Sequence, residues 1–307
     1  MADYITFAEL QAEVGQAIKD LNTAKATLIK AIINQVYLNE VPFFDSLYPP
    51  FWLLDFDDSL GSKANMTITG ASKATAGVIT VAHSLIVGDI ISVYGITGMT
   101  ELNNRTYQVG TIPSAGASIT LKDLDGTAIN TTNYTTYVSG GSIVHRGLTL
   151  ATTGKDVQTL NKAGFWGYDP MNPIGIDELE KDAINKWTDS PGRPLRYFHR
   201  KAFTSTGTEI NQLLWFPGAD GAHDLKYWYI KRLNKLSDNG DVPLLPPQFH
   251  ETIVTGAIAR LAETNVQVEN QVVWPSLYQM QQQAIVEFNR RWWESHKNTE
   301  KQKPYLL

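Results

Sequence analysis

An abrupt change of composition in the middle of the chain most constrains its fold. Between about Asn65 and Ile143, leucine and charged residues become scarce, while Thr, Gly, Ile and Val dominate. The regions before and after this stretch instead carry apolar residues at helical spacing. The two patterns together predict an α+β protein in which an all-β segment interrupts a helical frame.

The interrupting region predicts a small antiparallel barrel or sandwich. Short β-prone runs are separated by turn-forming residues, for example around Gly88, Asn103 and Gly126. Closely spaced short strands with polar turns are typical of such all-β domains. The expected strands are residues 77–82, 89–95, 105–112, 117–123 and 135–141.

Helical signals fill the N-terminal region. Residues 6–39 carry apolar side chains at spacings of three and four, which lines one face of an α-helix. Thr6 followed by Glu9 is a capping-box signal, and Asn22 with Thr23 indicates a kink or a short break. We therefore expect two consecutive helical stretches before the insert.

Strand and helix signals alternate after the insert. A short helix is expected over residues 176–187. Three strand-like runs follow, at residues 194–203, 209–216 and 223–233. The turn composition of residues 217–221 predicts that the last two runs form a hairpin.

The C-terminal part predicts two longer helices. One begins at Pro246 and Pro247, because proline is favourable in the first turn of a helix. The other follows Pro275 and ends near Lys297, and the polar tail beyond it is expected to be extended.

The predicted fold is a helical bundle with a β-hairpin, interrupted by an inserted small all-β barrel or sandwich domain. The helical core takes residues 1–62 plus 146–307, and the insert takes residues 63–145. No apolar run approaches the ~20 residues that a membrane helix needs, so no membrane contact is expected.

Charge and cysteine content exclude several functional classes. The net charge is -5, so the positive excess typical of nucleic-acid-binding domains is absent. The chain has no cysteine, which excludes disulfides, thiolate metal sites and thiol nucleophiles.

Acidic residues are the main sequence feature that suggests chemistry. Asp55, Asp57 and Asp58 could hold a divalent cation or divide acid and base roles, but a solvated loop is the simpler interpretation. No HExxH, GxSxG or phosphate-binding glycine motif occurs. We predict no catalytic, cofactor-binding or metal-binding residue, and no enzymatic activity.

One C-terminal segment resembles a known protein family. Residues 226–263 combine a strand with paired aromatics, a loop ending in Leu-Pro, a helix start with histidine and a helix of small residues. This order resembles the C-terminal half of tailed-phage head-to-tail adaptor proteins, also called connectors. The matching positions are Tyr227, Trp228, Tyr229, Leu245, Pro246, His250, Gly256, Ala257, Ala259 and Leu261.

The insert carries a second resemblance. Residues 84–112 resemble a β module common in phage structural proteins, which is similar to the first catalytic-cysteine half-domain of ubiquitin-activating enzymes. Because the chain lacks cysteine, this resemblance implies only a fold. The matching positions are Gly88, Asp89, Val93, Gly95, Gly98, Met99, Leu102, Asn103, Arg105, Thr106 and Tyr107.

The resemblances imply a structural protein of the virion neck, assembled in the host cytoplasm. Rings of twelve are usual in the adaptor family, so a homo-oligomeric ring beneath the portal is implied, joining head to tail. Its partners would be the portal protein, other copies of this chain, and tail or nozzle proteins. DNA would pass through the channel without specific binding. The alternative is a virion-associated glycan-active protein, with carboxylates such as Asp57 and Glu251, or a glycan-binding protein with tyrosines on the insert.

A basic and aromatic segment near the C-terminus is the candidate partner interface. Trp and Arg are enriched at protein interfaces, although an ordinary helix end or a DNA contact would use the same residue types. The last residues form an apolar tip after a polar stretch, which favours a segment that orders on binding over a frayed terminus. The candidate residues are Arg290, Arg291, Trp292, Trp293, Tyr305, Leu306 and Leu307.

Overall fold

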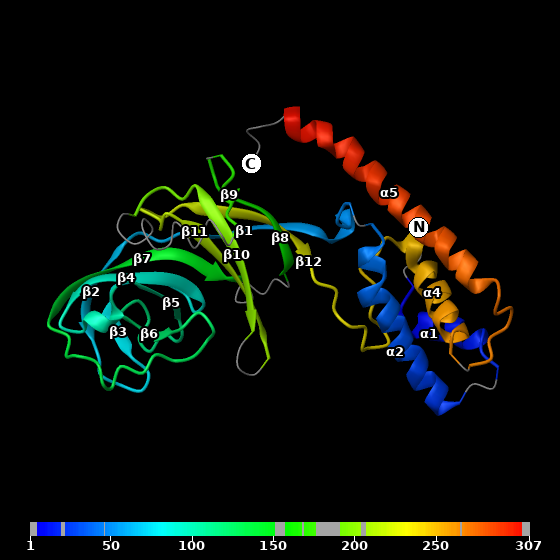
Figure 1. Ribbon diagram of the computed structural model, residues 1–307, viewed down its shortest axis with the longest axis horizontal. Coiled ribbons are helices and arrows are strands. Elements are labelled where there is room, and N and C mark those ends of the chain that lie inside the picture. The colour runs from blue at the N-terminus through cyan, green and yellow to red at the C-terminus, as the bar shows by residue number, and fades with distance from the viewer. Residues whose placement is uncertain are drawn as a thin grey trace. The chain divides into compact units, whose positions relative to one another are not determined.

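The computed structural model divides the chain into two compact units (Figure 1). The helical unit comprises residues 1–54 and 232–306, and the β unit comprises residues 55–231. The predicted α+β class is therefore confirmed. The structure describes residues 5–19, 22–45, 47–150, 157–167, 169–175, 191–203, 207–264 and 266–302.

Four described α-helices build the helical unit. The predicted break before Thr23 is confirmed, because the Asn22 side chain accepts a hydrogen bond from the Lys25 backbone N–H and so caps the second helix. The capping box of Thr6 and Glu9 also forms as predicted. The helices are α1 (Phe7–Gln16), α2 (Thr23–Asn39), α4 (His250–Ala262) and α5 (Trp274–Gln302).

Helix α4 lies at the centre of this unit and contacts α1, α2 and α5. An added Cβ on Gly256 would lie 2.5 Å from Tyr278 Cε2 and 2.9 Å from Val36 Cγ1, so glycine permits the close approach of three helices. Arg260 of α4 donates to both carboxylate oxygens of Glu40 at the end of α2, at 2.9 and 3.0 Å. Tyr278 of α5 donates to the same carboxylate at 2.8 Å, so one acid joins three helices.

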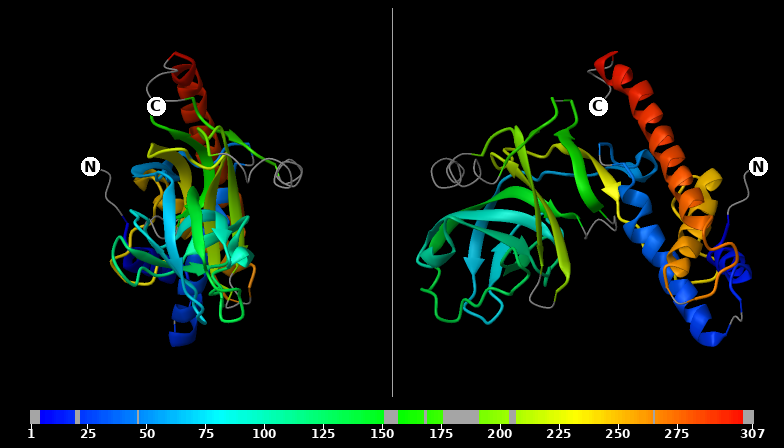
Figure 2. Two further views of the ribbon diagram at one scale, coloured as in Figure 1. Left: turned by 90° about the vertical axis from the view of Figure 1, so that its left-hand side faces the viewer. Right: turned by 45° about the vertical axis from the view of Figure 1, so that its right-hand side comes forward.

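Helix α5 is longer than its neighbours, and its C-terminal end extends past α4 (Figure 2). The helix continues to Gln302. The prediction of an extended tail after Lys297 is therefore wrong for residues 298–302. The short helix predicted over residues 176–187 lies outside the described residues. Among the described helices, none is long and apolar enough to cross a membrane.

A closed six-stranded antiparallel barrel forms one part of the β unit. Its strands follow the order β2-β3-β6-β5-β4-β7, and β2 pairs with β7 to close it. Apolar side chains such as Ile79, Val93 and Tyr107 fill its interior. The prediction of a small all-β barrel is therefore confirmed. The strands are β2 (Met66–Ala71), β3 (Val78–Val81), β4 (Asp89–Thr97), β5 (Arg105–Val109), β6 (Ser118–Lys122) and β7 (Ser139–Thr149).

Strand β7 extends beyond the barrel and pairs there with a further strand. Its C-terminal end pairs with β11 (Glu209–Phe216), which pairs antiparallel with β10 (Arg196–Phe203). The short strand β9 (Asn172–Pro173) adds to β10 in parallel. The predicted hairpin between residues 209–216 and 223–233 is wrong, because the hairpin partner of β11 is β10.

A three-stranded sheet in the order β1-β12-β8 completes the β unit. Its strands are β1 (Leu54–Gly61), β8 (Val157–Phe165) and β12 (Asp224–Lys231). The acidic segment predicted as a solvated loop lies in β1 instead, because pairing with β12 satisfies its backbone groups. The two ends of the β unit lie side by side, since Lys231 Nζ is 2.9 Å from Asp55 Oδ2.

The unit boundaries differ from the predicted domain boundaries. The sequence placed them after residues 62 and 145, whereas the structure divides the chain after residues 54 and 231. The physical reason is β7, which pairs with β4 inside the barrel and with β11 outside it. The barrel is therefore continuous with β11, β10 and β9.

Candidate functional site

The described candidate interface residues, Arg290 to Trp293, lie on the C-terminal half of α5, which contacts the segment between α2 and the β unit. Phe51 stacks on Trp292 with ring centroids 4.7 Å apart and planes 8° apart. Tyr48 stacks on Trp293 at 6.1 Å, and Trp293 Nε1 donates to the Pro49 carbonyl oxygen at 2.8 Å. Both tryptophans are thus half-buried against their own chain.

A polar network fixes the same segment to α5. The buried Asn289 accepts a hydrogen bond from the Phe51 N–H at 3.1 Å. Arg290 Nε lies 3.2 Å from Asp45 Oδ2. Burial by itself would raise the pKa of the Asp45 carboxyl, but the Leu47 N–H, Arg290 and Asn289 hold that pKa below its ordinary value. Asp45 therefore stays ionised and anchors this segment to the helix.

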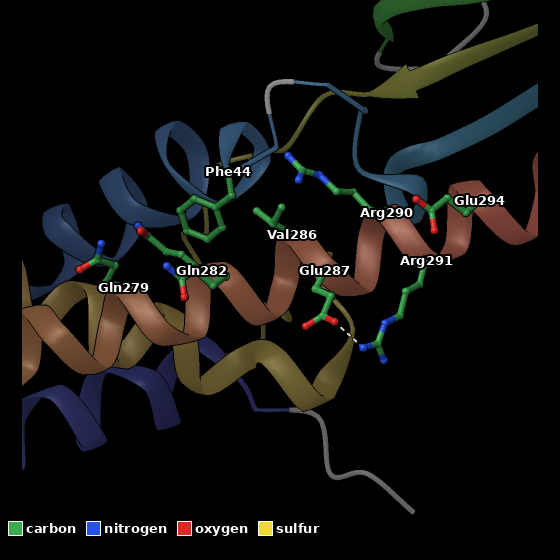
Figure 3. A pocket seen from close by; sticks show the side chains of 9 residues that line it. Phe44, Gln279, Gln282, Val286, Glu287, Arg290, Arg291 and Glu294 are labelled. Carbon is green, nitrogen blue, oxygen red and sulfur yellow. Dashed lines mark hydrogen bonds and ion pairs between the residues drawn. The ribbon is translucent and has the colours of Figure 1, made fainter.

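A shallow groove of about 590 Å³ runs along α5 next to this network (Figure 3). Phe44 and Val286 provide apolar surface at its middle. Glu287 and Arg291 form an ion pair at its rim, and their side chains are 64% and 74% exposed. A groove with apolar and paired charged groups along a helix offers contact area to another protein segment.

The predicted interface residues divide into three groups. Arg290, Trp292 and Trp293 contact their own chain, as described above. Arg291 lines the groove and remains mostly exposed. Tyr305, Leu306 and Leu307 lie outside the described residues. The sequence identified the tryptophans but gave no signal for their contacts with Tyr48 and Phe51, because those contacts join segments about 240 residues apart.

The start of α4 contains a buried histidine. His250 Nδ1 accepts a hydrogen bond from the Ile5 N–H at 3.2 Å, and Nε2 lies 2.8 Å from the Leu245 carbonyl oxygen. Nε2 therefore carries the proton and the ring is neutral. Burial lowers the pKa of His250, although the carbonyl oxygens of Leu245 and Pro243 act in the opposite direction. These contacts tie the N-terminal segment to α4.

The acidic residues of β1 make structural contacts. The buried Asp57 accepts hydrogen bonds from the Ser59 N–H at 2.8 Å and from its hydroxyl at 2.6 Å. Asp55 pairs with Lys231 and accepts a hydrogen bond from the Tyr229 hydroxyl at 3.3 Å. Burial and the neighbouring carboxylates raise the pKa of Tyr229 to about 12. In the described ranges, no three His, Asp or Glu side chains gather as metal ligands would.

Sequence reasoning missed a cluster of aromatic and lysine side chains on the three-stranded sheet. Lys226 Nζ lies 4.8 Å from the Phe56 ring centroid, 5.5 Å from that of Trp166 and 5.1 Å from that of Trp228. The signal available in the sequence was the alternation of Lys226 and Trp228 with two buried tyrosines. The three rings come from three different chain segments, so only the fold reveals that they converge.

Three tyrosines of the insert pack against the barrel core, which limits the ring surface that they offer to a glycan. Tyr107 is buried in the barrel interior, and Tyr134 and Tyr137 pack against the same core. No protein-family model matches this chain, and no curated protein matches it.

Proposed function

We propose that the chain is a structural subunit of a tailed-phage neck, a head-to-tail adaptor that assembles as a ring of twelve beneath the portal. The observation that carries the proposal is the path of residues 226–263. Tyr227 and Tyr229 lie in β12, a loop leads to Pro246, and Gly256 lies in α4. The aromatic strand, loop and small-residue helix follow one another in the order that the adaptor resemblance implies.

The organisation of the chain also supports this proposal. We propose that α1, α2, α4 and α5, which come from both ends of the chain, form a bundle, and that the β unit is inserted between them in the sequence. Glu40, Arg260 and Tyr278 hold three of these helices together through one carboxylate. Such a fixed bundle suits a building block that must repeat the same geometry in every subunit of a ring.

The groove along α5 is the surface that we assign to partner contact. Its apolar centre at Phe44 and Val286 is flanked by the charged pair Glu287 and Arg291. Interfaces commonly place apolar contacts at the centre and charged residues at the rim. In the adaptor proposal, the portal or the adjacent subunit occupies this groove. Passing DNA makes no specific contact, which is consistent with a net charge of -5.

The proposal is tested by mixing the full chain with the purified portal ring of the same virus. Sedimentation velocity measures the bound fraction. We expect binding of the wild type and at least about tenfold weaker binding of a groove variant, Val286→Glu with Arg291→Glu, because new charge in an apolar contact opposes docking. Lys30→Glu, an exposed charge reversal on α2, is the matched control and should bind as the wild type does.

Two failures have different meanings. If the wild-type chain does not bind the portal ring, the adaptor function is contradicted. If the groove variant binds as tightly as the wild type, portal contact takes place elsewhere, and the assignment of the groove to the portal is wrong. The melting temperature of each variant is measured alongside, so that lost binding is separated from lost folding.

A further inference from the structure

The three-stranded sheet has one face that presents aromatic and charged side chains. In the ladder between β12 and β8, Lys226 lies opposite Gly164 and Trp228 lies opposite Lys162. Side chains of directly opposed residues lie on the same face of a sheet. The Trp166 ring, just after the end of β8, lies on that face too, since its centroid is 5.5 Å from Lys226 Nζ. The intervening Tyr227 and Ala163 are fully buried on the other face.

Aromatic rings surround the lysine at the centre of this face. Lys226 Nζ lies between 4.8 and 5.5 Å from the ring centroids of Phe56, Trp166 and Trp228. Lys162 Nζ lies 5.6 Å from the Trp228 centroid. We call these five side chains the aromatic-lysine cluster. Its rings attract the ammonium groups through their π faces, which fixes two cations at an exposed surface.

The cluster is exposed to solvent although much of it is apolar. Phe56 is 48% exposed and Trp166 is 57% exposed. Large apolar groups that gather at the surface of a soluble protein commonly mark a binding site. A ligand of this cluster would contact both the ring surfaces and the ammonium groups.

A polar cavity adjoins the cluster. Gly164 connects the two, because a Cβ on this residue would point to the outer face and lie 3.2 Å from Pro170 Cα. Pro170 also lines a cavity of about 390 Å³. The polar residues of that cavity are Asp169, Asn172, Arg193 and Arg196.

We propose that the cluster and the cavity together form a binding site for a carboxylated saccharide, such as a uronic-acid or sialic-acid sugar. A sugar ring offers an apolar C–H face for Trp166 and Phe56. Its carboxylate suits Lys226, Lys162 and the cavity guanidinium groups, since arginine and lysine bind carboxylates by charge-assisted hydrogen bonds.

The acidic residues of the same surface distinguish this ligand from a nucleic acid. Asp58 follows Phe56 by two residues on β1, and Asp224 precedes Lys226 by two residues on β12, so both lie on the outer face. Asp169 lies in the cavity. These carboxylates accept hydrogen bonds from sugar hydroxyls, whereas a chain of phosphates offers them few donors. A ligand with one carboxylate per ring and several hydroxyls fits both sets of charges.

Isothermal titration calorimetry with the full chain tests the site. The probes are tetragalacturonate and 3′-sialyllactose, and the neutral methyl ester of tetragalacturonate is the matched control ligand. We expect at least one acidic probe to bind with a Kd below about 1 mM and the methyl ester to bind at least about tenfold more weakly. Trp166→Ala and Lys226→Gln should each weaken binding about tenfold or more.

Phe203→Ala is the matched control variant, because Phe203 is a 67% exposed aromatic residue of the same unit that does not belong to the cluster. It should leave the Kd unchanged.

The proposal is overturned if neither acidic probe binds with a Kd below about 5 mM, or if both cluster variants bind as the wild type does. Equal binding of the methyl ester overturns it as well. Binding of decathymidylate that depends on Trp166 while the saccharides fail would assign the surface to single-stranded nucleic acid instead. The ring proposal is independent of every one of these outcomes.

Discussion

Gly256 is a residue at which α4 closely approaches both α2 and α5. Replacing it with alanine places a methyl group against the rigid ring of Tyr278, which cannot move as a flexible chain end could. Overpacking costs about 1–3 kcal/mol, while better helix propensity returns about 1 kcal/mol. We expect Gly256→Ala to lower the melting temperature by about 3–6 °C in a circular-dichroism melt.

Gly240→Ala is the control for this substitution, because nothing lies within 4 Å of a Cβ at Gly240. It should change the melting temperature by less than about 1 °C. A melting temperature of Gly256→Ala equal to or above that of the wild type would show that the three helices do not pack at this distance.

His250 makes the stability of the helical unit depend on pH. Burial lowers its pKa in the folded state, so near its ordinary value of about 6.5 the unfolded chain binds a proton that the folded chain does not. The free energy of unfolding therefore falls as the pH decreases through about 6.5. His250→Asn should be less stable than the wild type at pH 7.5, and this difference should shrink by pH 5.

Urea unfolding of both proteins at several pH values measures this difference. His199 also has a pKa lowered by burial, but it is present in both proteins and its effect cancels. A difference that stays constant from pH 7.5 to pH 5 would mean that His250 titrates alike in the folded and unfolded chains.

Individual residues were predictable where their role is local. Thr6, Glu9 and Asn22 cap helices through contacts three residues away, and the sequence contains the whole signal. The role of Asp57 was not predictable, because the Tyr227 hydroxyl that donates to it comes from a residue 170 positions later in the sequence. The same limit applies to Trp292, Trp293 and the aromatic-lysine cluster.

Among the elements, helices α2, α4 and α5 depend on the carboxylate of Glu40. Glu40→Gln keeps the shape of the side chain but removes the charge that accepts hydrogen bonds from Arg260 and Tyr278. We expect a loss of about 1–2 kcal/mol in the free energy of unfolding, measured with urea.

Glu263→Gln is a matched control, since Glu263 pairs with the same Arg260 but its side chain is 57% exposed. A surface ion pair contributes little, so this variant should lose less than about 0.5 kcal/mol. Equal effects of the two substitutions would contradict the central role of Glu40.

The helices were easier to predict than the strand pairings. Apolar periodicity defines α1, α2, α4 and α5 within their own segments, and caps add to it for α1 and α2. Strand pairing depends on residues far apart, so the turn-like segment 217–221 was assigned to a hairpin although β11 pairs with β10 and β12 with β8. Strand β1 was missed because Asp55, Asp57 and Asp58 have low strand propensity, which tertiary pairing overrides.

At the scale of the whole molecule, the ion pair of Asp55 and Lys231 brings the ends of the β unit together. Joining residue 54 to residue 232 by a short Gly-Ser linker should therefore leave a helical unit that folds by itself. Circular dichroism should show a helical spectrum and one cooperative thermal transition. A chain that melts without cooperativity would show that the helices need the β unit in order to fold.

The division into a helical frame and a β region was visible in the sequence, because composition changes near Asn65 and Ile143. The limits of the β region were not visible in the sequence. The composition of the segments that form β1, β8, β10, β11 and β12 resembles that of the helical frame. The candidate interface could be placed on the last helix from its Arg and Trp residues. The groove beside it could not, because Phe44 reaches it from the other end of the chain.

We propose that copies of this chain form a ring on the portal, and cryo-electron microscopy of the full chain bound to the portal ring of the same virus can show that ring. We expect a closed ring of twelve copies with an open axial channel beneath the portal. Single copies scattered on the portal, or no added density at saturating concentrations of the chain, would contradict it.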